Sequence, residues 1–240
     1  MFNRSNQFIF YINAVIAVFG ILIALLTGFV VIGLIFSTCA LLLIYEQIKQ
    51  NKFVFTISDL KKILTIHDTG GNKATQTQIQ MTIACHADNP EYWFRNIRAI
   101  GSVSNFRING SDPAEQKLEN GNYQVCMKLP PELKAIDGFD TTLSCDYDDA
   151  FTKTEGLLTH VVADDTRQLS LTVELPKGRP ISSARFYCIH DGKEEALLPP
   201  TVTGQTRIEA NIANPILGAE YCLQWNWPED SVMQKISRLF

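Results

Sequence analysis

The hydrophobic pattern of the chain changes character near residue 53. Residues 8–45 form one apolar run, and residues 5–45 contain no Asp, Glu, Lys, Arg or His. From Phe53 onward apolar and polar residues alternate with a period of two, which is typical of strands with one buried face. The pattern therefore predicts two parts, an apolar N-terminal segment and a β-rich domain.

The apolar run is too long for one membrane helix. A bilayer core about 30 Å thick is crossed by about 20 helical residues, whereas residues 8–45 as a single helix would measure about 57 Å. Two helices, near residues 8–26 and 29–45, fit the membrane well, with the reversal at Gly28. A single helix kinked at a glycine is the alternative, and a cleavable signal peptide is excluded by the length of the run.

The residues around and within this segment give it an expected orientation and packing. Basic residues lie only at its two ends, so the positive-inside rule places both termini, and the β-rich domain, in the cytoplasm. Small residues and one amide would let the helices approach closely, either within the hairpin or between copies of the chain. The candidate helix-packing residues are Asn13, Gly20, Gly28 and Gly33.

The β-rich region is expected over residues 53–228. Short alternating segments are separated by turn residues, and in two of them, residues 168–175 and 220–227, the apolar side chains share one face. The predicted fold class is thus a membrane α-helical hairpin (residues 1–52) plus an all-β soluble domain, an antiparallel sandwich or barrel. A seam near residues 146–150 leaves one large sandwich or two β subdomains open, and residues 229–240 have the spacing of an amphipathic helix.

Charge and cysteine usage narrow the functional classes. The chain has 21 Lys and Arg against 25 Asp and Glu, a net charge of −4. Such an acidic chain is not expected to bind a nucleic-acid polymer, which needs clustered cations. The six cysteines contain no CxxC pair, so neither a structural zinc site nor another metal or cofactor is predicted.

One cluster of residues has the chemistry of a ligand pocket. Aromatic rings can stack on a base while arginine binds phosphate, and the candidate ligand-binding residues are Tyr92, Trp93, Arg95 and Arg98. The alternative is a set of core aromatics with arginines at the rim. No catalytic motif is present and no catalytic residues are predicted, so we expect a protein that is not an enzyme.

The arrangement of an apolar hairpin (residues 8–45) before a β region (residues 53–227) resembles the two-transmembrane β-rich effectors of bacterial anti-phage signalling systems such as CBASS. The resemblance implies a bacterial inner-membrane protein that forms homo-oligomers and disrupts the bilayer when its β domain binds a cyclic nucleotide or a defence-system partner. No motif is matched residue by residue, so no binding residues are transferred.

Two other functions are compatible with the same sequence. One is a passive membrane anchor or scaffold whose β-sandwich docks a protein partner. The other is a membrane-tethered hydrolase with a dispersed active site, which would require a His or Cys beside a carboxylate in a cleft.

Overall fold

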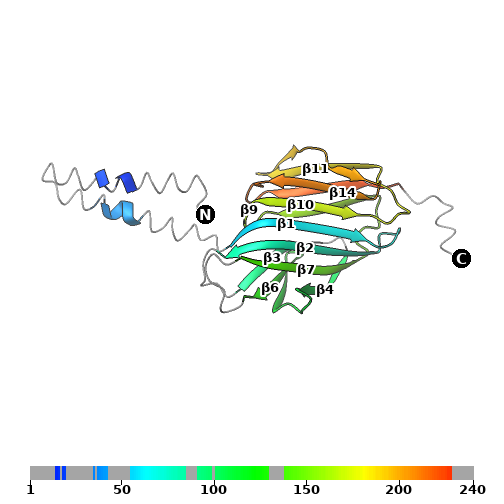
Figure 1. Cartoon of the computed structure of the whole chain (residues 1–240), viewed down its shortest axis with the longest axis horizontal. Coiled ribbons are helices and arrows are strands. Elements are labelled where there is room, and N and C mark those ends of the chain that lie inside the picture. The colour runs from blue at the N-terminus through cyan, green and yellow to red at the C-terminus, as the bar shows by residue number, and fades with distance from the viewer. Residues whose placement is uncertain are drawn as a thin grey trace. The chain divides into compact units, whose positions relative to one another are not determined.

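The computed structural model describes residues 14–16, 18–19, 35, 37–42, 55–84, 91–98, 101–129 and 138–228 (Figure 1). The chain divides into two compact units, Met1–Phe53 and Val54–Phe240. The described residues of the first unit are helical, and the ordered elements described in the second unit are all strands.

The predicted transmembrane hairpin is corrected by the structure. A bilayer span needs about 20 continuous apolar helical residues. Within the described residues, no helix reaches the length and apolar character that crossing a membrane requires. We therefore withdraw the hairpin from the fold class, and with it the inner-membrane location with both termini in the cytoplasm. Asn13, Gly20, Gly28, Gly33 and the predicted helix at 229–240 lie outside the described residues.

The β unit is built from strands of two to twelve residues. Their bounds are β1 Phe55–Ile66, β2 Lys73–Ala84, β3 Glu91–Ile97, β4 Ser102–Ile108, β5 Glu115–Glu119, β6 Asn122–Lys128, β7 Gly138–Asp148, β8 Glu155–Val161, β9 Asp165–Thr166, β10 Gln168–Glu174, β11 Ser183–His190, β12 Lys193–Ala196, β13 Thr201–Thr203, β14 Arg207–Ala213 and β15 Glu220–Asn226.

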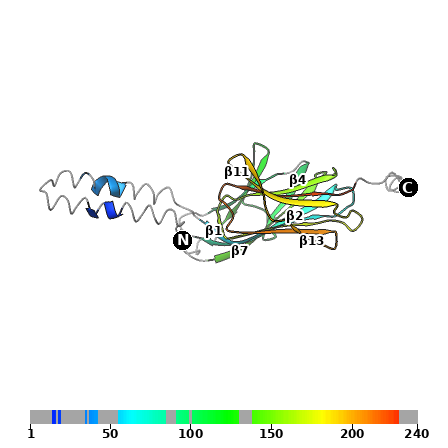
Figure 2. The ribbon, with the colours of Figure 1, turned by 90° about the horizontal axis from the view of Figure 1, so that it is seen from above.

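The strands form three sheets in two layers. The large sheet has the order β13-β14-β10-β1-β2-β7-β4, with β9 paired to β1, and its central strands lie side by side in Figure 1. Two smaller sheets, β12-β11-β15-β8 and β3-β6-β5, make the second layer. Figure 2 shows β13 and β7 in one layer and β11 in the other. Residues on both sides of the predicted seam at 146–150 belong to this one unit.

The core lies between the layers and follows the predicted strand faces where the pattern is clear. On β10, Leu169, Leu171 and Val173 are at most 1% exposed. On β15, Leu223 and Trp225 are fully buried. The expectation that the apolar side chains of these two segments share a face is therefore confirmed.

The large sheet departs from the expected antiparallel pattern at its centre. β1 pairs with β10 in parallel, with Leu60 opposite Leu169, and also with β9 in parallel. A parallel pair needs a long crossover connection, and here the chain between β1 and β10 contains the strands β2 to β9. Local alternation does not reveal strand direction, which is why the expected antiparallel arrangement is wrong at this point of the sheet.

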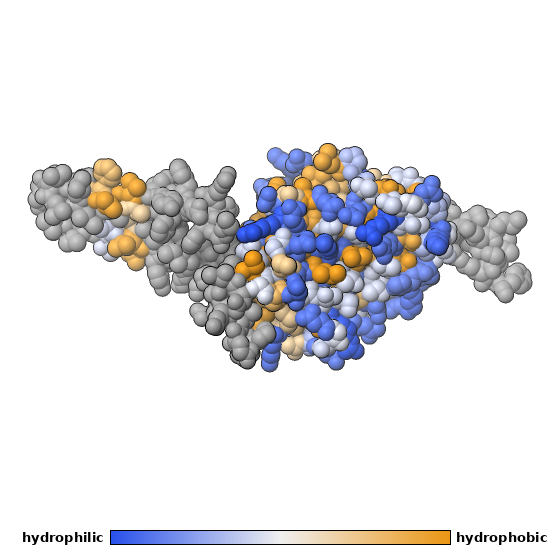
Figure 3. Space-filling view, in the orientation of Figure 1, coloured by the Kyte–Doolittle hydropathy of each residue, from blue (hydrophilic) through white to orange (hydrophobic). Residues whose placement is uncertain are grey.

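Strand β2 turns its polar side chains toward the core. Gln76, Gln78 and Gln80 are at most 7% exposed, while Ile79 and Met81 are 41% and 48% exposed on the opposite face. The buried amides form a ladder, in which Gln78 donates to Gln80 (2.8 Å) and Gln80 donates to the Thr82 hydroxyl (3.0 Å). Polar and apolar side chains are interspersed over the surface shown in Figure 3.

Candidate functional site

A cleft of about 700 Å³ opens between the two smaller sheets, with the large sheet as its floor. Its floor residues Lys62, Gln76 and Tyr147 come from β1, β2 and β7, the central strands of that sheet. β8 and β15 supply one wall, and the turn between β5 and β6 supplies another with Arg98. The volume is in the range of small-molecule sites.

Lys62 is a buried cation at the floor of this cleft. Its side chain shares the inward face of β1 with Leu60 and Leu64, and the residue is 4% exposed. The ammonium donates a hydrogen bond of 2.8 Å to the backbone carbonyl of Thr159. Among the described residues no carboxylate lies within 4 Å of the ammonium. Because burial disfavours the charged form, the pKa of Lys62 is lowered to about 8, so the group is still largely charged at pH 7.

Gln76 adds a second donor beside Lys62. It faces the same side of the sheet and is 3% exposed. The Tyr147 hydroxyl donates to the Gln76 amide oxygen at 3.0 Å, whereas the Gln76 amide nitrogen is buried with no hydrogen-bond partner in the described structure. A buried donor without an acceptor is costly. The floor of the cleft therefore offers more donors than the protein itself satisfies.

Two titratable groups near Lys62 are held neutral, while two others, Glu220 and Arg98, are paired with each other. Burial raises the pKa of the Cys145 thiol to about 12, although the nearby ammonium opposes this shift. Burial, together with the charge of Lys62, lowers the pKa of His160 to about 3. A thiol with a raised pKa is a poor nucleophile, and a strongly acidified imidazolium makes a weak base. The surroundings suit binding of a charge better than proton transfer.

An ion pair crosses the mouth of the cleft. Arg98, just after β3, lies 3.4 Å from a Glu220 oxygen on β15, and its Nε donates to the Asn122 side-chain oxygen at 2.5 Å. The two smaller sheets are thereby connected above the floor. Both partners remain accessible, since the Arg98 side chain is 51% exposed and that of Glu220 24%.

The predicted ligand-binding residues are divided between two places. Arg98 lies at the cleft, whereas Tyr92, Trp93 and Arg95 border a separate cavity of about 20 Å³, which has room for roughly one water molecule. The Tyr92 ring is buried edge-on against Phe55 and Phe94.

The Tyr92 ring is buried in the core, and the Lys117 side chain covers one face of the Trp93 ring. The Tyr92 hydroxyl donates to Asp164 at 3.3 Å, and burial raises its pKa. The Lys117 ammonium lies 4.4 Å from the centre of the Trp93 ring. Arg95 is exposed on β3. This arrangement leaves the rings little surface on which a base could stack.

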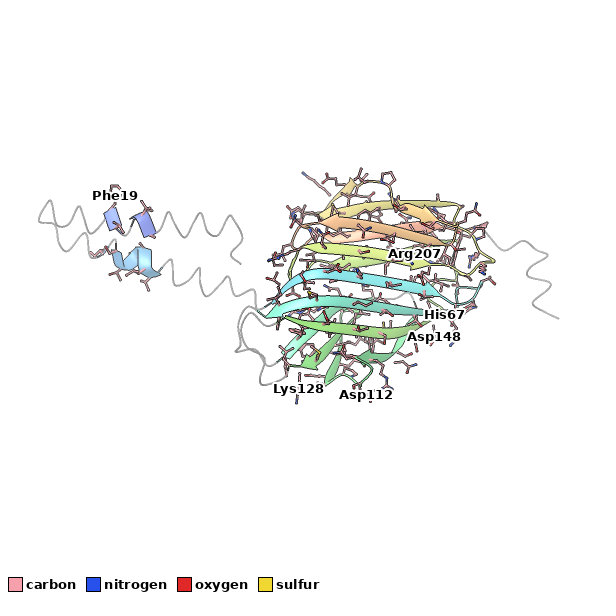
Figure 4. The ribbon with its side chains drawn as sticks, in the orientation of Figure 1. Phe19, His67, Asp112, Lys128, Asp148 and Arg207 are labelled. Atoms are coloured by element: carbon pink, nitrogen blue, oxygen red, sulfur yellow. The ribbon has the colours of Figure 1, made fainter. Side chains whose placement is uncertain are left out.

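Polar side chains at one end of the large sheet have partners within the protein. His67 lies within 2.9 Å of the Thr75 hydroxyl, and Asp148 pairs with Lys73 (Figure 4). Arg207 pairs with Glu174 at 3.1 Å. Across the described residues no group of three His, Cys, Asp or Glu side chains is arranged to hold a metal ion.

Sequence reasoning did not single out Lys62, Gln76 or Tyr147. Both faces of β1 carry apolar residues near Lys62, because Ile63 faces outward and Leu64 faces inward. The sequence alone therefore did not show which face of this strand is buried. The signal in the sequence was a lysine on the same strand face as Leu60 and Leu64, which suggests a buried charge. It becomes informative only when the pairing with β10 fixes which face is covered.

No protein-family model matches this sequence, and no curated protein matches it. Among solved structures, an M1 zinc metallopeptidase from Deinococcus radiodurans is similar, with 11% identity and a TM-score of 0.39 over 70% of this chain and 42% of that chain. A provisionally described protease from Parabacteroides distasonis ATCC 8503 is 8% identical, with a TM-score of 0.45. The match covers 73% of this chain and 41% of that chain. Yeast LTA4 hydrolase in complex with bestatin is 11% identical, with a TM-score of 0.39, and the match covers 72% of this chain and 29% of that chain. The chain spans less than half the length of these structures.

Proposed function

We propose that the β unit is a non-enzymatic binding module, and that its cleft holds the anionic group of a ligand. The observation that carries the proposal is the Lys62 ammonium, buried at the floor of the cleft without a carboxylate partner in the described structure. A buried charge is costly unless it is paired. A bound carboxylate or phosphate would supply that pair.

The neighbouring groups support binding of an anion rather than a cation or a neutral molecule. Gln76 offers an unsatisfied N–H beside Lys62, and Arg98 adds a second positive charge at the mouth. Glu220 already pairs with Arg98, so it offsets that charge until a ligand competes for it. An entering anion would meet Arg98 first and Lys62 last.

The position of Arg98 supports a sensing role. Its ion pair with Glu220 joins the two smaller sheets, so a ligand that draws Arg98 away from Glu220 would change the contact between them. Such a ligand must bind the two arrangements with different affinity in order to shift their populations. The cyclic nucleotide, the homo-oligomer and the defence-system partner stay predictions, and the buried ring of Tyr92 and the covered face of Trp93 favour an anion without a stacked base.

The test is a calorimetric titration of the full chain with inorganic phosphate and with succinate. Lys62→Met removes the ammonium and keeps the apolar stem, and Lys61→Met is the matched control because Lys61 is its exposed neighbour on the opposite face. We expect the wild type and K61M to bind at least one anion and K62M to lose binding at least about tenfold. Equal affinity in K62M, or no binding of either anion by the wild type, would refute the proposal.

A further inference from the structure

Strand β8 lies at the edge of its sheet and directs half of its backbone groups away from the sheet. Among the strands that the structure describes, its hydrogen-bonding neighbour in the order β12-β11-β15-β8 is β15 alone. Backbone bonds join Trp227 to Thr154 and Val162 to Ala219, both at 3.0 Å. Bonded pairs alternate in an antiparallel ladder, so the even-numbered residues of β8 bond to β15 and the odd-numbered ones point outward.

The outward edge of β8 runs along the cleft. Leu157 and Thr159 both line it, and the Thr159 carbonyl accepts the hydrogen bond from Lys62. In the part of the chain that the structure describes, the backbone N–H groups of these two residues and the Leu157 carbonyl have no protein partner. The Leu157 side chain is 44% exposed. An edge strand with free backbone groups is a template for a further strand.

We infer that the ligand of this cleft is an extended peptide that adds to β8 as a new strand and places a carboxylate on Lys62. The inference rests on the proposed function and names its ligand class. Strands pair about 4.8 Å apart, which is the position that the cleft leaves open beside β8. Main-chain hydrogen bonds to Leu157 and Thr159 would supply affinity, and the buried ammonium would select an acidic residue.

In this arrangement the Lys62 ammonium lies where an acidic side chain of the added strand would reach it. Lys62 reaches the β8 edge from below, so an acidic side chain on the added strand that pairs with the inward-facing Leu158, and is therefore directed to the floor, would meet the ammonium beside the Thr159 carbonyl. The Gln76 N–H lies on the same floor and would bond to the second carboxylate oxygen. Side chains of the added strand that alternate with the acidic one would point to the open mouth.

A short synthetic peptide tests this arrangement. The probe is an acetylated, amidated hexapeptide of alternating threonine and valine with one central glutamate, titrated calorimetrically into the full chain. Three variant peptides serve as comparisons. One carries glutamine in place of the glutamate, and the other two each carry a single N-methyl group, placed on one or the other of two adjacent backbone amides. We expect the glutamine peptide and one N-methyl peptide to bind at least about tenfold more weakly, and the other N-methyl peptide to lose less than about threefold.

Variants of Leu157 probe the protein side of the same bonds. Leu157→Pro removes an N–H that faces the cleft and not β15, and proline is tolerated on strand edges. Leu157→Ala keeps the N–H and removes the side chain. We expect L157P to weaken the glutamate peptide at least about tenfold, and L157A to weaken it less than L157P does. Thermal melting verifies that both variants fold, and the N-methyl peptides carry the test if L157P does not.

The outcomes separate the inference from the proposed function. If phosphate or succinate binds in a Lys62-dependent manner but the peptide does not bind, the peptide inference is wrong and the anion site stands. Equal effects of the two N-methyl groups would also overturn the inference, because a strand bonds through alternate amides only. If a free C-terminal carboxylate on the glutamine peptide restores binding through Lys62, the inference holds with that carboxylate as the anchor.

Discussion

The ammonium of Lys62 and the backbone carbonyl of Thr159 lie 2.8 Å apart and join β1 in one layer to β8 in the other. The hydrogen bond uses one of three ammonium N–H groups and leaves the others at the floor of the cleft. A lysine placed only to support the fold would be better replaced by an apolar side chain of similar size. Its retention is understandable if the charge serves a ligand.

Replacing Lys62 should therefore stabilise the protein while it weakens anion binding. We expect Lys62→Met to raise the free energy of unfolding by about 2 kcal/mol at pH 7, because a buried charge without an ionic partner is removed. Urea denaturation measures the change, and K61M, which alters an exposed lysine 3.2 Å from Asp59, should lie within about 0.5 kcal/mol of wild type. A loss of stability in K62M would show that the Thr159 bond outweighs the cost of the buried charge.

The stability of the wild type should depend on alkaline pH through Lys62. Its pKa of about 8 lies below the ordinary 10.5, so the unfolded chain holds more protons than the folded chain between these values. The free energy of unfolding contributed by this group should thus rise by about 3 kcal/mol from pH 8 to 10.5. The difference between wild type and K62M in urea denaturation isolates this effect from tyrosine and cysteine titration. A difference that does not change with pH would contradict it.

His160 should make the protein sensitive to acid. Its pKa of about 3 lies below the ordinary 6.5, so the unfolded chain takes up a proton first as the pH falls. Stability is lost from pH 6.5 downward. Between pH 7.5 and pH 5, the free energy of unfolding should fall by roughly 1 to 2 kcal/mol less in His160→Gln than in the wild type. Thermal unfolding at the two pH values measures this. Parallel losses in both proteins would assign the acid sensitivity to other groups.

Gly156 on β8 should tolerate no side chain. A Cβ at this position would lie 2.1 Å from Cζ2 of the Trp225 ring, which is fully buried. We expect Gly156→Ala to lower the free energy of unfolding by at least about 2 kcal/mol. The control is Gly138→Ala, where the nearest recorded atom is 3.9 Å away and the change should be within about 0.5 kcal/mol. Similar melting of the two variants would contradict the packing described here.

Neutralising Glu220 should strengthen anion binding. Glu220→Gln removes the carboxylate that pairs with Arg98 at the mouth of the cleft. We expect phosphate affinity to rise about threefold at low salt, with little change in stability because the pair is partly exposed. Glu115→Gln is the comparison, since Glu115 pairs with Lys117 on β5 and does not border the cleft. An unchanged affinity in E220Q would remove Arg98 and Glu220 from the site.

The sequence predicted the strands and their buried faces well where every second residue is apolar. β10 and β15 have such patterns, and their buried faces agree with the expectation. β2 has the opposite arrangement, because inside the protein the Gln78 amide donates to Gln80 and the Gln80 amide donates to Thr82, while Ile79 and Met81 lie outside. Alternation locates a strand, but the choice of face depends on partners that are distant in the sequence.

The candidate site was harder to predict than the strands. Arg98 was identified through the aromatic residues beside it, yet Tyr92 packs into the core, Trp93 lies half-buried against Lys117, and of the four predicted residues only Arg98 lines the cleft. Lys62, Gln76 and Tyr147 converge only because β1, β2 and β7 are adjacent in the large sheet. A site assembled from three strands with no shared motif leaves no spacing for sequence reasoning to detect.

The parallel pairing of β1 with β10 has a consequence for synthesis of the chain. Leu60 pairs with Leu169, so this edge of β1 has to wait for residues about a hundred positions downstream. At about 5 to 20 residues per second, translation of that stretch takes roughly 5 to 20 s. Throughout that time the nascent chain exposes an unpaired strand edge in the centre of its future sheet. Chaperone cover during translation would protect that edge, and slowed elongation before β10 should increase aggregation of the newly made protein.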